Sequence, residues 1–119
     1  MADFEIVLPC DGAATVDFDF AAAGAALDAL AKMGSKLSDQ VTAREGLATD
    51  VVVNWQGYFR TEFDRASGLL QSRFTAGAEL AGYAALPIWT AIGDANEAQR
   101  QLNAAARAEQ ARLAEAAAD

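Results

Sequence analysis

Two long helical patterns, joined by a short segment that can form a tight turn, constrain this chain more than any other feature. Apolar residues recur at three- and four-residue steps over about residues 20–53 and again over about 59–117. The segment between them, residues 54–58, reads Asn-Trp-Gln-Gly-Tyr. Gly57 can adopt the positive φ that ends a helix, and Trp55 offers a large apolar ring to pack between two helices. The pattern therefore predicts an all-α fold, a two-helix antiparallel hairpin with a Trp-x-Gly turn.

The second helix carries two apolar stripes, and a single neighbouring helix can cover only one of them. One stripe is a seam of mostly small residues that suits close packing against the first helix. We expect another chain to cover the second stripe, so that two hairpins form a four-helix bundle on dimerisation, as a homodimer or a heterodimer. The second stripe consists of Leu69, Leu80, Tyr83, Leu86 and Ile92.

An uncharged run from Leu80 to Gly93 contains much of the second stripe, together with Trp89. The run is too short to span a bilayer as a helix. It is either an exposed patch that docks on a partner or a membrane surface, or a helix face that is buried inside an assembly. Trp89 distinguishes the two, because a solvent-facing Trp on this patch would indicate docking. Trp89 is therefore included in the predicted partner surface.

Pro87 lies inside the second helical pattern. A proline in a helix interior lacks a backbone donor and clashes with the carbonyl four residues earlier, which costs about 3 kcal/mol. We therefore expect a kink or a break near residues 86–94. Gly93 and Asp94, followed by Glu97, resemble a helix stop and a capped restart in that region. The alanine-rich C-terminal tail is expected to be an exposed helix.

Residues 1–19 are predicted to form a short extended arm that precedes the hairpin of residues 20–119. A Cys-Asp-Gly turn signal at residues 10–12 divides the arm into two limbs. An isolated hairpin is only marginally stable, so we expect the apolar face of the arm to dock on the helices. Asp17 or Asp19 is a suitable N-cap for the first helix. The alternating apolar residues are Phe4, Ile6 and Leu8 in the first limb and Val16, Phe18 and Phe20 in the second.

The composition argues against several classes of function. A net charge of −8 with no histidine argues against nucleic acid and anionic lipid as partners. Without histidine the sequence has no imidazole base, and its single cysteine cannot form a zinc site. It also lacks the glycine-rich loop that binds phosphate. We predict a non-enzymatic protein with no catalytic residues, cofactor or metal. Because it shows neither a signal peptide nor a transmembrane segment, we expect it in the cytoplasm before any export.

The Trp-x-Gly turn, the two helical segments and the acidic, alanine-rich, histidine-free composition resemble the WxG superfamily of type VII secretion, the early-secreted-antigen-like proteins. The family's Trp and Gly correspond to Trp55 and Gly57, and the resemblance covers about residues 20–105. It implies a hairpin that pairs with a second WxG-like hairpin into an antiparallel four-helix bundle. Such proteins are exported folded by a membrane ATPase, without a cleaved signal peptide, or serve as partners and targeting factors for larger substrates. The composition also resembles that of high-GC actinobacterial proteins.

One departure from the family concerns the Tyr-x-x-x-Asp/Glu export signal that follows the second helix in one partner. The match in this chain, Tyr58 and Glu62, lies at the turn instead. We therefore expect that export to the cell surface or medium, if it occurs, uses the signal of a partner. Two other functions remain open from the sequence. The chain is alternatively a cytoplasmic helical adaptor or scaffold, or a pairing module that binds the helical head of a secreted toxin.

Overall fold

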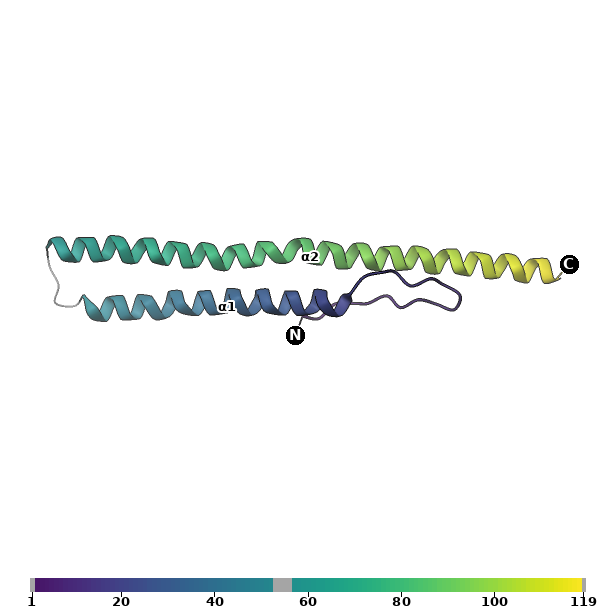
Figure 1. The fold of residues 1–119 in the computed structure, drawn as a ribbon, viewed down its shortest axis with the longest axis horizontal. Coiled ribbons are helices and arrows are strands. Elements are labelled where there is room, and N and C mark those ends of the chain that lie inside the picture. Colours follow the sequence, from purple (N-terminus) through teal and green to yellow (C-terminus); the bar gives the residue numbers. More distant parts are fainter. Residues whose placement is uncertain (1, 53–56, 119) are drawn as a thin grey trace. The chain divides into compact units, whose positions relative to one another are not determined.

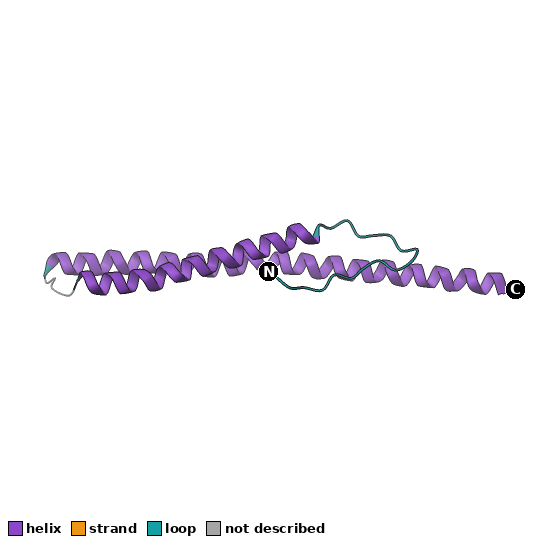
Figure 2. Cartoon of the chain, turned by 90° about the horizontal axis from the view of Figure 1, so that it is seen from below, coloured by secondary structure: helices purple, strands orange, loops and turns teal. Residues whose placement is uncertain are grey.

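The computed structural model describes residues 2–52 and 57–118 (Figure 1). Helix α1 spans Phe20–Val51 and helix α2 spans Tyr58–Ala118. Within the described part of the chain, all regular secondary structure is helical (Figure 2). The predicted all-α class is therefore confirmed, and so are the two long helices, with boundaries close to those expected.

The chain divides into two compact units, and each unit contains part of both helices. The first unit is Leu27–Leu86, which holds most of α1 and the first half of α2, and we call it the hairpin unit. The second unit combines Met1–Ala26 with Pro87–Asp119, and we call it the arm unit.

In the hairpin unit, α1 and α2 run antiparallel and approach each other closely at glycines. A Cβ atom on Gly34 would lie 3.7 Å from the carbonyl oxygen of Ala78, and one on Gly77 would lie 3.2 Å from Cδ1 of Leu37. Residues later in α1 contact residues earlier in α2, which is the order of an antiparallel hairpin. Small residues at the seam thus allow the close packing that the sequence predicted.

Polar and aromatic contacts join the two helices farther along the hairpin unit. The Nε2 group of Gln71 donates a 2.8 Å hydrogen bond to the backbone carbonyl of Val41. The guanidinium of Arg44 lies 4.8 Å from the ring centroid of Phe74, which is cation–π geometry. These contacts fix the register of α1 against α2 beyond what the small seam residues alone would specify.

Gly57 adopts the positive φ that the sequence indicated, at +81°, but not at the end of α1. It immediately precedes α2, and its carbonyl oxygen accepts hydrogen bonds from both the backbone N–H and the hydroxyl of Thr61. Gly57 therefore starts the second helix instead of ending the first. The remaining part of the predicted turn that includes Trp55 lies outside the described residues, at positions 53–56.

Helix α2 continues through Pro87 to Ala118, so of the kink or break expected near residues 86–94 the break is not present. A proline removes one backbone donor, but the alanine-rich sequence on both sides has high helix propensity and bridges the gap. Gly93 and Asp94 accordingly lie inside the helix and do not form a stop and restart. The tail of α2 is exposed, as expected.

In the arm unit, the arm leads into a capped α1. The carboxylate of Asp19 accepts a 2.9 Å hydrogen bond from the backbone N–H of Ala22, so Asp19 is the N-cap. The arm itself is extended, and the turn at its tip includes Gly12 with a φ of +82°. A hydrogen bond of 3.0 Å from the N–H of Ala13 to the carbonyl of Cys10 closes this turn, as the sequence predicted.

Candidate functional site

Four residues of the predicted partner surface are exposed on α2 within the hairpin unit. The exposed fractions are 50% for Leu69, 68% for Leu80, 66% for Tyr83 and 57% for Leu86. Ala81, on the side of α2 that faces α1, is only 5% exposed. An interval of eleven residues is close to three helical turns, so Leu69 and Leu80 share one face. We call these four exposed residues the outer stripe.

The other two predicted partner residues belong to the arm unit and behave differently. Trp89 is 41% exposed and packs edge-to-face on Phe4, with ring centroids 6.0 Å apart. Ile92 is only 3% exposed. Its assignment to a partner surface is wrong, because its side chain is already buried in its own unit. It lies four and seven residues before Asn96 and Gln99, and these spacings place it on the α2 face that binds the arm.

Three side-chain amides on α2 hold the arm, and we call them the amide row: Asn96, Gln99 and Asn103. Each carboxamide accepts a hydrogen bond from a backbone N–H of the arm and donates one to the carbonyl two residues earlier. All the contacts with the arm are to main-chain atoms. Asn96 binds the N–H of Val7 (2.8 Å) and the carbonyl of Glu5 (2.7 Å), Asn103 binds the N–H of Cys10 (3.0 Å) and the carbonyl of Leu8 (3.0 Å), and Gln99 binds the N–H of Val16 (2.8 Å) and the carbonyl of Ala14 (2.9 Å).

The spacing of the amides on α2 matches the spacing of carbonyls in the outbound limb of the arm. Seven residues of helix rise about 10.5 Å, and three residues of a polyproline-II-like extended chain rise about 9.3 Å. Because the two rises are similar, amides that are seven residues apart on α2 lie opposite carbonyls that are three residues apart on the arm. The pairs are Asn96 with Glu5, Asn103 with Leu8, and Gln110 with Asp11, the last at 2.6 Å.

The amide row is buried and its hydrogen bonding depends on the arm. Gln99 is 0% exposed, Asn96 6% and Asn103 5%. Gln99 also donates a 3.1 Å hydrogen bond to Oδ1 of Asn103, which links the row internally. A buried amide without partners costs about 1–3 kcal/mol, whereas each hydrogen bond that is formed contributes about 1 kcal/mol net. The arm therefore completes the polar interior of this unit, and the amides in turn hold the arm in one register.

The side chains of the arm contribute less than its main chain. None of the described residues 2–19 is fully buried, and Ile6 and Leu8 are 45% and 74% exposed. Of the predicted apolar face, Phe4 does dock, against Trp89 and against Phe20 with ring centroids 6.3 Å apart. The expected two-residue alternation is wrong for Ile6 and Leu8, because the three-residue register of the main chain decides which groups of this limb face α2. In the return limb it is confirmed, since Asp17 and Asp19 are exposed and the apolar residues that alternate with them are half-buried.

The amide row was missed in the sequence, although a signal for it exists. Asn96, Gln99 and Asn103 follow each other at steps of three and four, so they form a polar stripe on one face of α2. The small residues around them were instead interpreted as part of the seam that packs against the first helix. A polar amide stripe inside an otherwise apolar pattern is a signal for an extended chain whose backbone needs partners.

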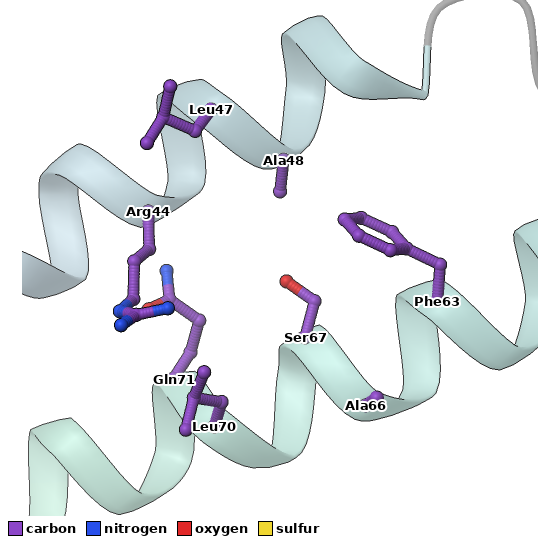
Figure 3. Close-up of a pocket in the computed structure, with 8 residues that line it drawn as sticks. All are labelled: Arg44, Leu47, Ala48, Phe63, Ala66, Ser67, Leu70 and Gln71. Atoms are coloured by element: carbon purple, nitrogen blue, oxygen red, sulfur yellow. The ribbon is translucent and has the colours of Figure 1, made fainter.

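A separate pocket lies between α1 and α2 in the hairpin unit (Figure 3). The Nε2 group of Gln71 is bonded to α1, while its Oε1 atom is buried and has no hydrogen-bond partner among the described residues. The hydroxyl group of Ser67 also points into the pocket in Figure 3. A donor group in the pocket would complete the hydrogen bonding of Gln71. The lining residues are Arg44, Leu47, Ala48, Phe63, Ala66, Ser67, Leu70 and Gln71.

Ionisable groups in the described part of the chain do not gather into a cluster of three or more metal ligands. Arg112 donates hydrogen bonds of 2.7 and 3.0 Å to Glu109 and lowers the pKa of that carboxyl. Both side chains are exposed and lie three residues apart on the helix. Such a pair is a surface feature of α2 and contributes little to stability.

Comparisons with known proteins identify no relative. The chain matches no family model, no curated protein and no solved structure. Within the described residues, neither helix is both long enough and apolar enough to cross a membrane. The outer stripe and the amide row are the features of the chain that bear on its function.

Proposed function

We propose that this protein is a non-enzymatic helical hairpin of the WxG type that acts as a substrate, co-substrate or targeting partner in type VII secretion. In this proposal it pairs with another WxG-like hairpin, either a second copy or a different chain, to form a four-helix bundle. The outer stripe of α2 lies at the centre of that bundle. A larger secreted toxin and the secretion ATPase are the further partners.

The observation that carries the proposal is the exposure of the outer stripe. Leu80, Tyr83 and Leu86 recur at three-residue steps, and each is more than half exposed. Fully burying one such leucine stabilises an assembly by about 1.5–3 kcal/mol. Contiguous exposed apolar side chains commonly mark a protein–protein interface. A second helical hairpin has the shape and apolar seam needed to cover a stripe of this length.

Pairing alone does not separate secretion from the role of a cytoplasmic adaptor, because an adaptor would use the same stripe. An export assay separates them. A tagged full-length chain is expressed in its native host, with and without the gene for the secretion ATPase, and is quantified in cells and medium. We expect the protein in the medium or at the cell surface only when the ATPase is present.

A variant pair tests whether the outer stripe takes part in export. We expect the double substitution Leu80→Gln and Tyr83→Gln to lower export severalfold while the helical circular dichroism stays unchanged. The exposed polar change Arg73→Gln on the same helix is the matched control and should leave export intact. Export that persists without the ATPase, or no export in any strain, would argue for an adaptor and against the secretion proposal.

A further inference from the structure

The arm unit contains a polypeptide-binding site whose ligand belongs to the same chain. The amide row binds main-chain atoms of the arm, one N–H and one carbonyl per amide, at 2.7–3.0 Å. Because no arm side chain takes part in these bonds, the site recognises the course of a backbone and not a set of side chains. Such a site can bind the same backbone from another molecule.

The shape of the site specifies a looped ligand. Asn96 and Asn103 hold the outbound limb of the arm, whereas Gln99 holds the return limb. The loop closes at Gly12, whose φ of +82° favours glycine, and a Cβ atom there would lie 3.0 Å from Nε2 of Gln110. A single straight peptide would leave Gln99, which is 0% exposed, without its main-chain partners. The site therefore selects a segment that turns back on itself.

Release of the arm breaks the ring contacts of Phe4 with Trp89 and Phe20, but it removes no fully buried side chain of the arm from an apolar core. No side chain of described residues 2–19 is fully buried, and the hydrogen bonds to the amide row can be replaced by bonds to water. Segments with few buried apolar contacts open at lower free energy than the rest of a protein. On release, the arm stays attached to the start of α1 through residues 17–19, where Phe18 packs on Phe20 with ring centroids 4.8 Å apart.

We propose that the amide row exchanges its ligand between molecules, so that the arm of one copy binds α2 of a second copy. A second copy supplies the same looped backbone with the same spacing of carbonyls and the same Gly12 turn. Every hydrogen bond of the closed form is therefore reproduced in the exchanged form. This exchange does not depend on the outer stripe, and it can occur whether or not the hairpins pair.

A complementation experiment with two full-length variants tests the exchange. The first variant, Val7→Pro with Cys10→Pro, lacks two of the N–H donors of the arm and keeps the amide row intact. The second, Asn96→Ala with Asn103→Ala, keeps the arm intact and disables the row, and its helix is retained because alanine favours helix. Cys10 is the single cysteine of the sequence, so every thiol in the mixture belongs to the arm of the second variant. In the closed chain this thiol lies 3.6 Å from the carbonyl of Asn103.

The measured quantity is the rate at which Cys10 of the second variant reacts with a thiol reagent. We expect this rate to fall severalfold when the first variant is added, with saturation at equimolar concentrations. Adding Gln99→Ala to the first variant should abolish the protection, because the return limb then has no partner. A rate that stays unchanged on mixing, while both variants retain helical circular dichroism, would overturn the exchange.

Synthetic peptides of residues 2–18, made with Cys10→Ser so that they add no thiol, provide a second test if the first variant is perturbed. N-methylation at Val7 removes an N–H that binds Asn96, whereas N-methylation at Ile6 removes one that binds none of the three amides. We expect the peptide methylated at Ile6 to displace the arm and restore the Cys10 rate, and the peptide methylated at Val7 to have no effect. Equal action of the two peptides, or no displacement by either, would contradict main-chain recognition by the amide row.

Discussion

At the scale of single residues, glycines determine how closely other segments approach α2. Gly77 leaves room for Leu37, and a Cβ atom there would lie 3.2 Å from Cδ1 of that leucine. Gly68 lies on the same helix, but a Cβ atom there would have no atom within 4 Å. A substitution at Gly68 therefore changes helix propensity alone, whereas one at Gly77 changes helix propensity and packing together.

Substitution of these two glycines by alanine should have different effects on stability. Alanine favours a helix interior over glycine by about 1 kcal/mol, so Gly68→Ala should raise the free energy of unfolding by about that amount. Gly77→Ala should gain less or lose stability, because Leu37 must move away from the new methyl group. Urea unfolding of both variants measures the difference. Equal gains would show that the seam is looser than the contact distance indicates.

Gly57 tests the positive φ at the start of α2. A side chain in the left-handed region costs roughly 1–2 kcal/mol, so Gly57→Val should lower the free energy of unfolding by about that amount. Gly57→Asn is the matched control, because asparagine tolerates this region better than other side chains. Thermal melts of the two variants give the comparison. A valine variant as stable as the asparagine variant would contradict a fixed positive φ.

Single residues also mark where sequence reasoning succeeded and where it failed. Positive φ at Gly57 and the N-cap at Asp19 follow from local rules, and both are observed. The burial of Gln99 does not follow from local rules, because an amide in a helix pattern is usually a solvent-facing residue. Its role depends on an arm more than eighty residues earlier in the chain, and no local pattern joins the two.

At the scale of elements, α2 is continuous although it contains a proline. The sequence predicted both long helices correctly because their apolar periodicity is sustained over many turns. Of the kink or break expected at Pro87, the break is absent, because the local penalty of one residue is smaller than the summed propensity and packing of its neighbours. The extended arm was predicted, but its register was not, since that register comes from the seven-residue spacing on α2.

Replacing Pro87 should stabilise the continuous helix. Proline is about 3 kcal/mol less favourable than alanine in a helix interior, so Pro87→Ala should raise the free energy of unfolding by up to that amount. The control Thr90→Ala, also exposed on α2, should gain at most about 0.7 kcal/mol from propensity alone. Urea unfolding provides both values. A gain for Pro87→Ala no larger than that for Thr90→Ala would mean that the helix does not pass through position 87 with regular geometry.

At the scale of the whole molecule, the two units carry different binding features. The hairpin unit carries the outer stripe, which remains exposed in the single chain. The arm unit buries a row of amides that binds an extended backbone. The sequence predicted Leu69, Leu80, Tyr83 and Leu86 as a surface for another chain, and their exposure is compatible with that role. The identity of the chain that covers them depends on the surface of that partner, which the sequence of this chain does not contain.

The most direct test of the central claim is the mass of the native assembly. The full-length chain is purified from its native host under mild conditions and measured by sedimentation velocity over a dilution series. We predict the mass of two hairpins. In the Asn96→Ala and Asn103→Ala background, where arm exchange cannot join two copies, we predict that Leu80→Gln, Tyr83→Gln and Leu86→Gln together reduce it to one chain without loss of helical circular dichroism. A folded single chain at every dilution, with no partner purified alongside it, would contradict the claim that the outer stripe pairs with a second hairpin.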